Sequence, residues 1–123
     1  MSIHESGENY LEKILMLSQT KEKVRAVDIC AALGFSRPTV SVMLRELREN
    51  GFVTTAANGG LALTPSGEAV ARRIYERHLL ITEALMALGV SRETALEDAC
   101  KIEHDISEET FTAIKKVYQR LKQ

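Results

Sequence analysis

Residues 26–51 read AVDICAALGFSRPTVSVMLRELRENG, and this stretch decides the fold. Its first part, residues 26–33, has the spacing of a short helix, which Gly34 can end. A second helix is expected over residues 37–50, with Ser36 as its N-cap. Two helices joined by a short glycine-containing turn form a helix-turn-helix.

The next stretch predicts a small β-hairpin. Two short runs, residues 52–55 and 61–64, flank an Asn58-Gly59 pair. Asn-Gly between such runs is a strong local hairpin signal. A helix-turn-helix followed by a hairpin has the order of a winged helix-turn-helix. In that motif the second helix enters the major groove of DNA, and the hairpin can lie against the DNA backbone.

The second helix has one apolar face and one polar face. Val40, Leu44 and Leu47 have the spacing of buried residues, so the polar positions are expected to face outward. A winged helix that makes protein contacts is the alternative, but a short, basic and capped helix favours insertion into a groove. The predicted DNA-binding residues are Arg37, Pro38, Thr39, Ser41, Arg45 and Asn58.

Helices are also expected on both sides of this motif. Residues 6–19 have helical periodicity, with Ser6 as a plausible N-cap. After the hairpin, residues 65–88 form a long amphipathic pattern, and Ser91 and Ser107 can each start a further helix. We therefore expect an all-α protein with a small β wing. A winged helix-turn-helix DNA-binding domain over residues 1–64 precedes a helical dimerisation and metal-binding domain over residues 65–123.

Composition limits the functional class. The chain has 123 residues, 45% of them hydrophobic, and no apolar run approaches the roughly 18 residues of a membrane span. The N-terminus lacks the pattern of a signal peptide, so a cytoplasmic protein without membrane contact is expected. Two cysteines are too few for a disulfide framework, and Cys30 is expected to be a core residue.

The net charge of −1 hides an uneven distribution. Residues 21–53 hold six basic and four acidic side chains, whereas residues 92–109 hold seven acidic and two basic ones. The first stretch can meet phosphates and the second can attract a cation, although a solvated surface without a partner explains either charge pattern equally well.

Four side chains suggest a metal site. Cys100, Glu103 and His104 are spaced i, i+3 and i+4, so one helix would present all three on one face. Thiolate, carboxylate and imidazole bind divalent transition metals. His78 interrupts the apolar stripe of the long helix, which is unfavourable unless its imidazole has a partner.

The first helix can add two more ligands. Asn9 and Glu12 are spaced i, i+3 beside the apolar face of that helix. Three helices could thus bring ligands to one point, and metal binding would then shift the population toward the conformer that presents them.

Five separated motifs follow one another along nearly the whole chain. They are Glu8-Asn-Tyr-Leu-Glu12, Ser36-Arg-Pro-Thr-Val-Ser41, Leu63-Thr-Pro-Ser-Gly67, Arg77-His78 and Cys100-Lys-Ile-Glu-His104. In this order they resemble the diphtheria toxin repressor and manganese transport regulator (DtxR/MntR) family. The resemblance implies homodimers that bind operator DNA when loaded with ferrous iron or manganese, and that repress uptake and related genes.

Carried over by position, the resemblance implies metal ligands at Asn9, Glu12, His78, Cys100, Glu103 and His104. Manganese-type members have a carboxylate at the position of Cys100 and Asp at that of Asn9, whereas iron-type members have Cys and Met. A thiolate shifts the preference toward softer metals. Fe²⁺ is therefore favoured and Mn²⁺ is next, with Zn²⁺ or Co²⁺ possible in vitro.

Two further departures bear on an ancillary iron-type site. Family members have Glu where Thr82 stands, and iron-type members have His where Leu96 stands. An ancillary site of that type is therefore not expected. The end at Gln123 matches the short two-domain form of the family.

Two rival interpretations remain open. One is a winged-helix regulator that responds to an organic ligand or to oxidation of Cys100 instead of a metal. The other is a zinc enzyme built on His78, Cys100, Glu103 and His104, which would leave the winged helix unexplained. The non-enzymatic interpretation is preferred.

Overall fold

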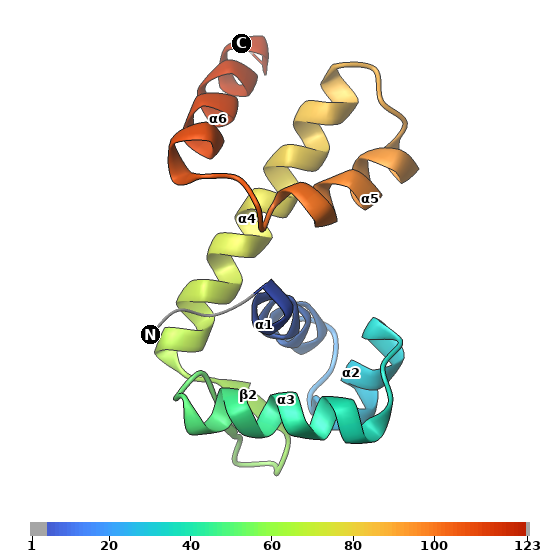
Figure 1. The fold of residues 1–123 in the computed structure, drawn as a ribbon, viewed down its shortest axis with the longest axis vertical. Helices are drawn as coiled ribbons and strands as arrows, with labels where there is room; N and C mark the ends of the chain where they lie inside the picture. Colours follow the sequence, from blue (N-terminus) through green and yellow to red (C-terminus); the bar gives the residue numbers. More distant parts are fainter. Residues whose placement is uncertain (1–4, 123) are drawn as a thin grey trace. The chain divides into compact units, whose positions relative to one another are not determined.

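A computed structural model describes residues 5–122 and contains, within that range, helices and one small sheet (Figure 1). The antiparallel sheet has two strands. The predicted all-α fold with a small β wing is thereby confirmed. The elements are α1 (Glu5–Ser18), α2 (Ala26–Leu33), α3 (Arg37–Glu49), β1 (Val53–Thr55), β2 (Leu61–Leu63), α4 (Pro65–Ala87), α5 (Arg92–Ile102) and α6 (Glu108–Lys122).

The chain divides into two compact units between Arg72 and Arg73, within α4. The first unit holds α1 to α3, the hairpin and the first residues of α4. The second holds the rest of α4 with α5 and α6. The expected domain boundary after Thr64 stays a prediction, because this division falls inside one continuous helix.

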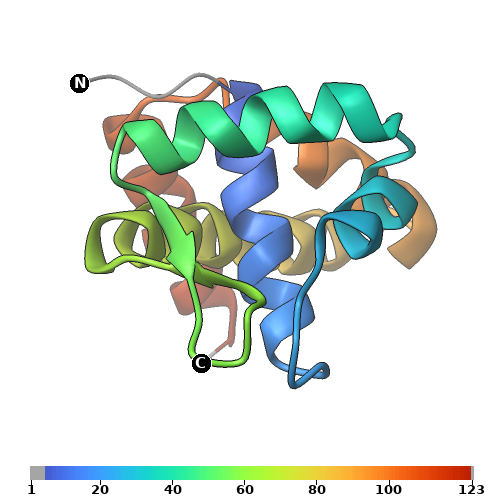
Figure 2. The same cartoon turned by 90° about the horizontal axis from the view of Figure 1, so that it is seen from below.

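In the first unit α1, α2, α3 and the hairpin enclose an apolar core (Figure 2). The predicted inner face of α3 is confirmed, since Val40, Leu44 and Leu47 are all buried. Hydrophobic burial therefore holds α3 in place and leaves its polar face outside. The other buried apolar residues of α1, α2, β1 and the loop before α2 are Tyr10, Leu11, Ile14, Leu15, Val24, Ile29 and Val53.

Local interactions set the ends of α2 and the start of α3. The carboxylate of Asp28 accepts a hydrogen bond from the backbone N–H of Arg25 (2.8 Å), and this bond lowers the pKa of Asp28. Gly34 ends α2 in the left-handed region at φ 74°, which glycine adopts without strain. Ser36 caps α3 as predicted, because its Oγ accepts from the N–H of Thr39.

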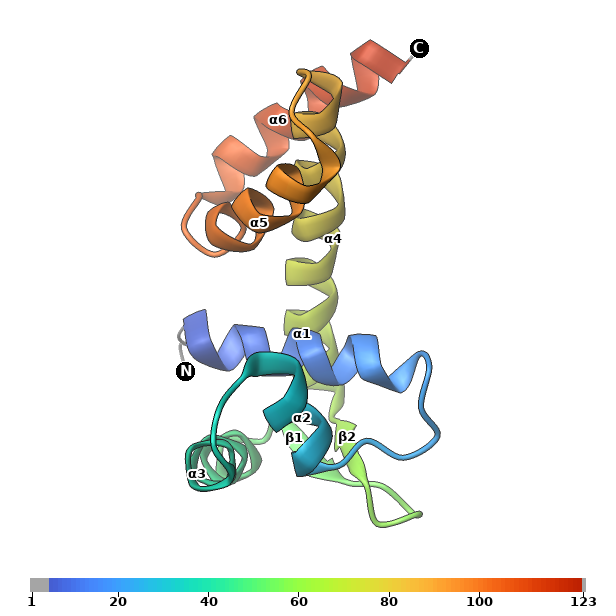
Figure 3. The ribbon, with the colours of Figure 1, turned by 90° about the vertical axis from the view of Figure 1, so that its right-hand side faces the viewer.

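The wing is the predicted hairpin around Asn58-Gly59 (Figure 3). Val53 pairs with Leu63 and Thr55 pairs with Leu61. Leu61 also donates a backbone hydrogen bond to the carbonyl of Val24, at 2.8 Å. The segment before α2 therefore extends the backbone pairing of the hairpin and fixes it to the helix-turn-helix.

In the second unit, α5 and α6 lie beside the C-terminal part of α4 (Figures 1 and 3). The predicted starts of both helices are confirmed: the hydroxyl of Ser91 accepts from the N–H of Thr94, and that of Ser107 accepts from the N–H of Thr110. A small apolar core joins the three helices. It contains Ile74, Ile81, Ala95, Ala99 and Phe111.

Two details differ from the sequence-based expectation. The helix α1 begins at Glu5, so Ser6 lies in its first turn and is not its N-cap. The acidic side chains of Glu5 and Glu8 favour this earlier start, because negative charge stabilises the N-terminal end of a helix dipole. Leu88 follows the end of α4 and is 76% exposed, so it does not extend the buried stripe of that helix.

Within residues 5–122, no single helix combines the length and the hydropathy needed to cross a membrane. Taken together, α2 and α3 meet that criterion, but the chain bends by 115° between them.

Gly67 is required by a close backbone approach at the start of α4. A Cβ atom added there would lie 2.0 Å from the carbonyl oxygen of Phe52, which is too close for any side chain. We expect Gly67→Ala to destabilise the protein by about 1–3 kcal/mol, as overpacking does, although Ala is the better helix former. Urea unfolding measures this change. Ser66→Ala, at the exposed preceding position, is the control, and an equally stable Gly67→Ala would contradict the structure.

Candidate metal centre and nucleic-acid interface

Three predicted metal ligands of the second unit meet at one point. The Nδ1 atom of His78 lies 2.9 Å from Oε2 of Glu103 and 3.9 Å from the Sγ atom of Cys100. One ligand atom from each of the three residues falls within 4.8 Å of the other two. Imidazole, thiol and carboxylate groups therefore converge, although His78 and Glu103 are 25 positions apart in the sequence.

Glu103 is the most buried member of this group. Its side chain has 0% exposure, and its Oε1 atom lies 3.4 Å from Nε2 of His104. His78 lies against the other carboxylate oxygen, so two imidazoles flank one buried carboxylate. Cys100, by contrast, is exposed, which leaves its thiol accessible from solvent.

The backbone at the end of α5 places these side chains. The helix ends at Ile102, so the expectation of a single helix through His104 is wrong in this detail. Glu103 is the C-cap, but its φ of −57° and ψ of −26° are still helical, and its N–H donates to the carbonyl of Ala99. The helical spacing from Cys100 to Glu103 is thus kept, and both side chains reach His78 on α4.

The residues present fit a divalent transition metal. Ligand atoms about 2.0–2.3 Å from an ion lie roughly 3–4 Å apart, and the two measured separations from His78 are close to this range. A buried carboxylate also requires a positive partner. A bound cation would supply that charge and replace the direct contact between His78 and Glu103.

The other two predicted ligands, Asn9 and Glu12, lie in the first unit, on α1. Asn9 is half-buried and Glu12 is buried. In the second unit, the hydroxyl of Thr82 donates to the carbonyl of His78 at 2.7 Å, so this side chain is bonded to its own helix. Whether an ancillary site forms near Thr82 stays a prediction.

The outer face of α3 presents the predicted DNA-binding positions. The helix begins with Arg37, Pro38 and Thr39, and all three side chains are exposed, as are those of Ser41 and Arg45. The hydroxyl of Thr39 accepts a hydrogen bond from that of Ser36, at 3.0 Å. This bond links two side chains at the start of α3, and the exposed Arg37 and Arg45 place positive charge at two positions along the helix.

The side chain of Asn58 makes two hydrogen bonds in the wing. Its side-chain amide donates to the carbonyl of Glu22 at 2.8 Å, and its Oδ1 atom accepts from the N–H of Gly60 at 2.9 Å. The Nζ atom of Lys23 would lie 3.6 Å from a Cβ atom added at Gly59. Lys23 therefore places a positive charge beside the wing tip.

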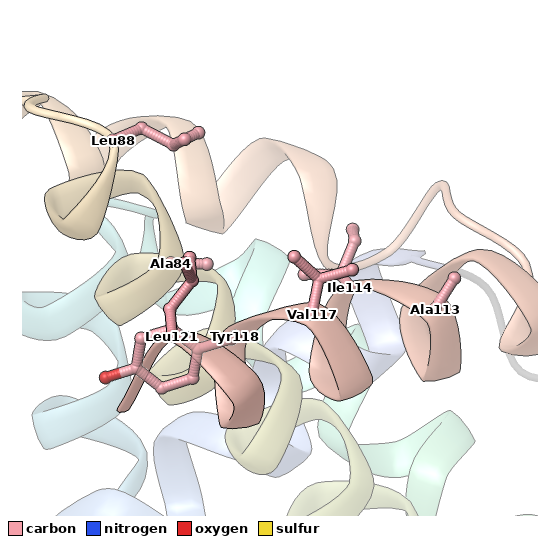
Figure 4. Close-up of a pocket in the computed structure, with 7 residues that line it drawn as sticks. All are labelled: Ala84, Leu88, Ala113, Ile114, Val117, Tyr118 and Leu121. Carbon is pink, nitrogen blue, oxygen red and sulfur yellow. The ribbon is translucent and has the colours of Figure 1, made fainter. Parts of the chain in front are cut away.

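The second unit also has an exposed apolar groove on α6 and the end of α4 (Figure 4). Val117 and Leu121 are 53% and 64% exposed, which is unusual for large apolar side chains in such a cluster. The groove has a volume of about 320 Å³. It is lined by Ala84, Leu88, Ala113, Ile114, Val117, Tyr118 and Leu121.

Comparisons with known proteins agree with this architecture. Residues 2–61 match the family model described as iron dependent repressor, N-terminal DNA binding domain. Residues 64–123 match the model described as iron dependent repressor, metal binding and dimerisation domain. The chain belongs to the iron-dependent repressor family. The resemblance to DtxR and MntR proteins is thereby confirmed, and the chain is a member of a family of metal-dependent transcriptional regulators.

Curated relatives share much of the sequence. The chain is 42% identical over 106 residues to the transcriptional regulator MntR of Salmonella typhimurium, which covers 86% of this chain and 68% of that protein. It is 39% identical over 113 residues to the MntR of Escherichia coli O6:H1, covering 92% and 73%.

Solved structures share the fold. The manganese regulator SloR superposes with a TM-score of 0.81 at 29% identity, covering 97% of this chain and 55% of that one. The IdeR protein of T. acidophilum superposes with a TM-score of 0.80 at 28% identity, with the same coverage. The chain thus spans about half the length of these two solved chains.

Two functional candidates were missed by sequence reasoning. Lys23 belongs to a charged loop whose position beside the wing depends on the pairing of Leu61 with Val24, which no local pattern predicts. Arg77 is 4% exposed and contacts the backbone of Glu103. In the sequence it stands in the Arg77-His78 motif, which assigned it no role.

Asn58 is expected to affect stability more than a surface residue of α3 does. Asn58→Ala removes two hydrogen bonds that close the wing, so we expect a loss of about 1–2 kcal/mol in the free energy of unfolding. Arg45→Ala is the comparison and should change it by less than about 0.5 kcal/mol. Urea unfolding of both variants tests this. Equal stabilities would mean that the amide of Asn58 does not hold the turn.

Proposed function

We propose that this protein is a metal-dependent transcriptional repressor that binds a palindromic operator as a homodimer and controls genes of iron or manganese homeostasis. The observation that carries the proposal is the convergence of His78, Cys100 and Glu103 on one point, in a chain whose α3 presents an exposed, capped and basic face. Family membership supports both halves of the proposal. As part of the same proposal, the protein acts on DNA in the cytoplasm, as a regulator without enzymatic activity.

The proposed ligand set combines both units. His78, Cys100, Glu103 and His104 supply imidazole, thiolate and carboxylate groups from the second unit. We assign the remaining ligands to Asn9 and Glu12 of α1, on the basis of their i, i+3 spacing and of family membership. Because α1 belongs to the DNA-binding unit, such a site would favour the conformers in which the two units hold one particular relation.

We propose that Fe²⁺ is the preferred metal and that Mn²⁺ is second. The thiol of Cys100 carries this preference, because sulfur ligands favour softer metals than Mn²⁺. Names among the relatives point both ways: the family model is called iron dependent, whereas SloR is called a manganese regulator. Zn²⁺ and Co²⁺ should also bind in vitro, since both accept thiolate and imidazole ligands.

For DNA recognition we assign the major groove to α3 and the DNA backbone to the wing. Arg37 and Arg45 supply charge at two positions along α3, and Thr39 and Ser41 supply hydroxyl groups between them. Pro38 fixes the first turn. Asn58 shapes the wing tip, to which Lys23 adds a positive charge.

The apolar groove of α6 and α4 supports the proposed homodimer. Large apolar side chains left in water, such as Val117 and Leu121, favour association with a second copy. This half of the chain matches a model described as metal binding and dimerisation domain. A two-fold dimer would present two copies of α3 about 34 Å apart, one turn of DNA, or a multiple of that distance.

The test is a DNA-binding titration of metal-free protein with Fe²⁺ (anaerobically), Mn²⁺, Co²⁺ and Zn²⁺ against a labelled pool of palindromic operators. Fluorescence anisotropy should report binding only with metal, and Fe²⁺ should act at a lower concentration than Mn²⁺. His78→Ala and Glu103→Gln should raise the required metal concentration by more than about 100-fold, beyond the range of outer-shell changes. Glu97→Gln, on the exposed side of α5, is the control.

A further variant tests which metal the protein prefers, independently of whether DNA binding requires a metal. Cys100→Glu should reverse the order of Fe²⁺ and Mn²⁺ while keeping metal-dependent binding, because it replaces sulfur with oxygen. Equal DNA binding with and without metal would overturn the metal-dependent mechanism. It would favour a regulator triggered by an organic ligand or by thiol oxidation, which the accessible Cys100 permits.

The dimer has a separate test. Introducing a charge with Val117→Glu or Leu121→Glu should convert the dimer to a monomer and abolish operator binding, as an unpaired charge cannot be buried in an apolar interface. Light scattering after size-exclusion chromatography measures the mass. Gln119→Glu, also exposed on α6, is the control. A dimer that persists in both groove variants would place the interface elsewhere.

A further inference from the structure

One buried arginine connects the three helices of the second unit. Arg77 lies on α4 directly before His78, and its side chain is only 4% exposed. Its Nη1 atom donates to the carbonyl of Glu103 at 3.1 Å and to that of Ile106 at 2.9 Å. Both carbonyls belong to the connection between α5 and α6, so a single nitrogen atom holds this connection at two points.

The rest of the guanidinium contacts the start of α6. Its Nη2 atom lies 3.0 Å from Oε2 of Glu108, the first residue of that helix. The carbon atom of the guanidinium lies 5.2 Å from the centre of the Phe111 ring, within the range of a cation–π interaction. Such a planar group with several fixed donors is suited to hold a loop in one conformation, which a lysine ammonium is not.

Glu103 is therefore held twice from neighbouring positions of α4. Arg77 binds its backbone carbonyl, and His78 binds its carboxylate at 2.9 Å. A buried arginine loses favourable hydration, and its Nε atom has no hydrogen-bond partner, so its bonds must offset this loss. These bonds stabilise the second unit. They also fix the backbone of Glu103, the residue that carries the central carboxylate.

We propose that Arg77 is a positioning residue of the metal centre. It sets the backbone of Glu103 so that the carboxylate meets His78 and Cys100, and it links this geometry to the first turn of α6. The proposal rests on the proposed function, because it assumes that the cluster binds metal. It assigns a role to a side chain that touches neither metal nor DNA.

The test is a Co²⁺ titration of the full chain, followed by the absorption of the thiolate–cobalt bond. Arg77→Lys keeps the charge but loses the planar guanidinium and its several N–H donors. It should weaken Co²⁺ binding by about 10- to 100-fold, the range for partners that orient metal ligands. The intensity and position of the thiolate band should also change, because the angle between sulfur and carboxylate ligands changes. Arg72→Lys, on the exposed side of the same helix, should match the wild type.

A purely structural role of Arg77 makes a different prediction. In that case Arg77→Lys lowers the urea midpoint, but the folded fraction binds Co²⁺ within about twofold of the wild-type affinity, with an unchanged spectrum. That result would overturn the proposal while leaving the proposed function intact. If the wild type itself binds no Co²⁺, the proposed function fails and the positioning role fails with it.

If Arg77→Lys does not fold, a milder variant tests whether Arg77 positions the metal centre. Glu108 is 66% exposed, so Glu108→Gln removes its ion pair with Arg77 at little risk to folding. Because the ion pair orients the guanidinium, Co²⁺ affinity should fall by about threefold, which corresponds to less than 1 kcal/mol. Glu109→Gln, the neighbouring exposed position, is the control. An affinity of Glu108→Gln equal to that of the control would overturn the proposal.

Discussion

The carboxylate of Glu103 is removed from water, and this constraint organises the second unit. A buried negative charge is unfavourable by several kcal/mol unless hydrogen bonds and positive charge compensate for it. His78 and His104 lie against its two oxygens, and Arg77 holds the carbonyl of the same residue. Arg77 and His78 are adjacent on α4, and both join this long helix to the end of α5 through Glu103. Arg77 also joins it to the start of α6 through Glu108.

This arrangement links packing to function. An imidazole stabilises the carboxylate by donating an N–H group to it, and a bound cation would stabilise it by its positive charge. A cluster that needs a positive charge and offers sulfur, nitrogen and oxygen ligands is suited to sense a divalent metal. In the first unit, by contrast, buried apolar side chains hold α3 in place, and hydrogen bonds of Leu61 and Asn58 hold the wing.

Much of the fold could be predicted from local sequence. Gly34, Ser36, Ser91 and Ser107 mark helix ends through backbone geometry and capping, and Asn58-Gly59 marks the hairpin. The convergence of His78 with Cys100 and Glu103 was also predicted, since helical spacing and an interrupted apolar stripe are local patterns. Contacts between distant segments were not predictable. The roles of Arg77 and Lys23 depend on the α5–α6 connection and on the pairing of β2 with Val24, neither of which leaves a periodic signal.

X-ray absorption spectroscopy of the Co²⁺-loaded or Zn²⁺-loaded protein tests the central claim most directly, because it counts the sulfur atoms bound to the metal. The arrangement of His78, Cys100 and Glu103 predicts one sulfur at about 2.3 Å, together with nitrogen and oxygen ligands at about 2.0–2.2 Å. In Cys100→Ser the sulfur contribution should disappear while nitrogen and oxygen ligands remain. A wild-type spectrum with only nitrogen and oxygen ligands would show that the cluster is not the metal centre proposed for it.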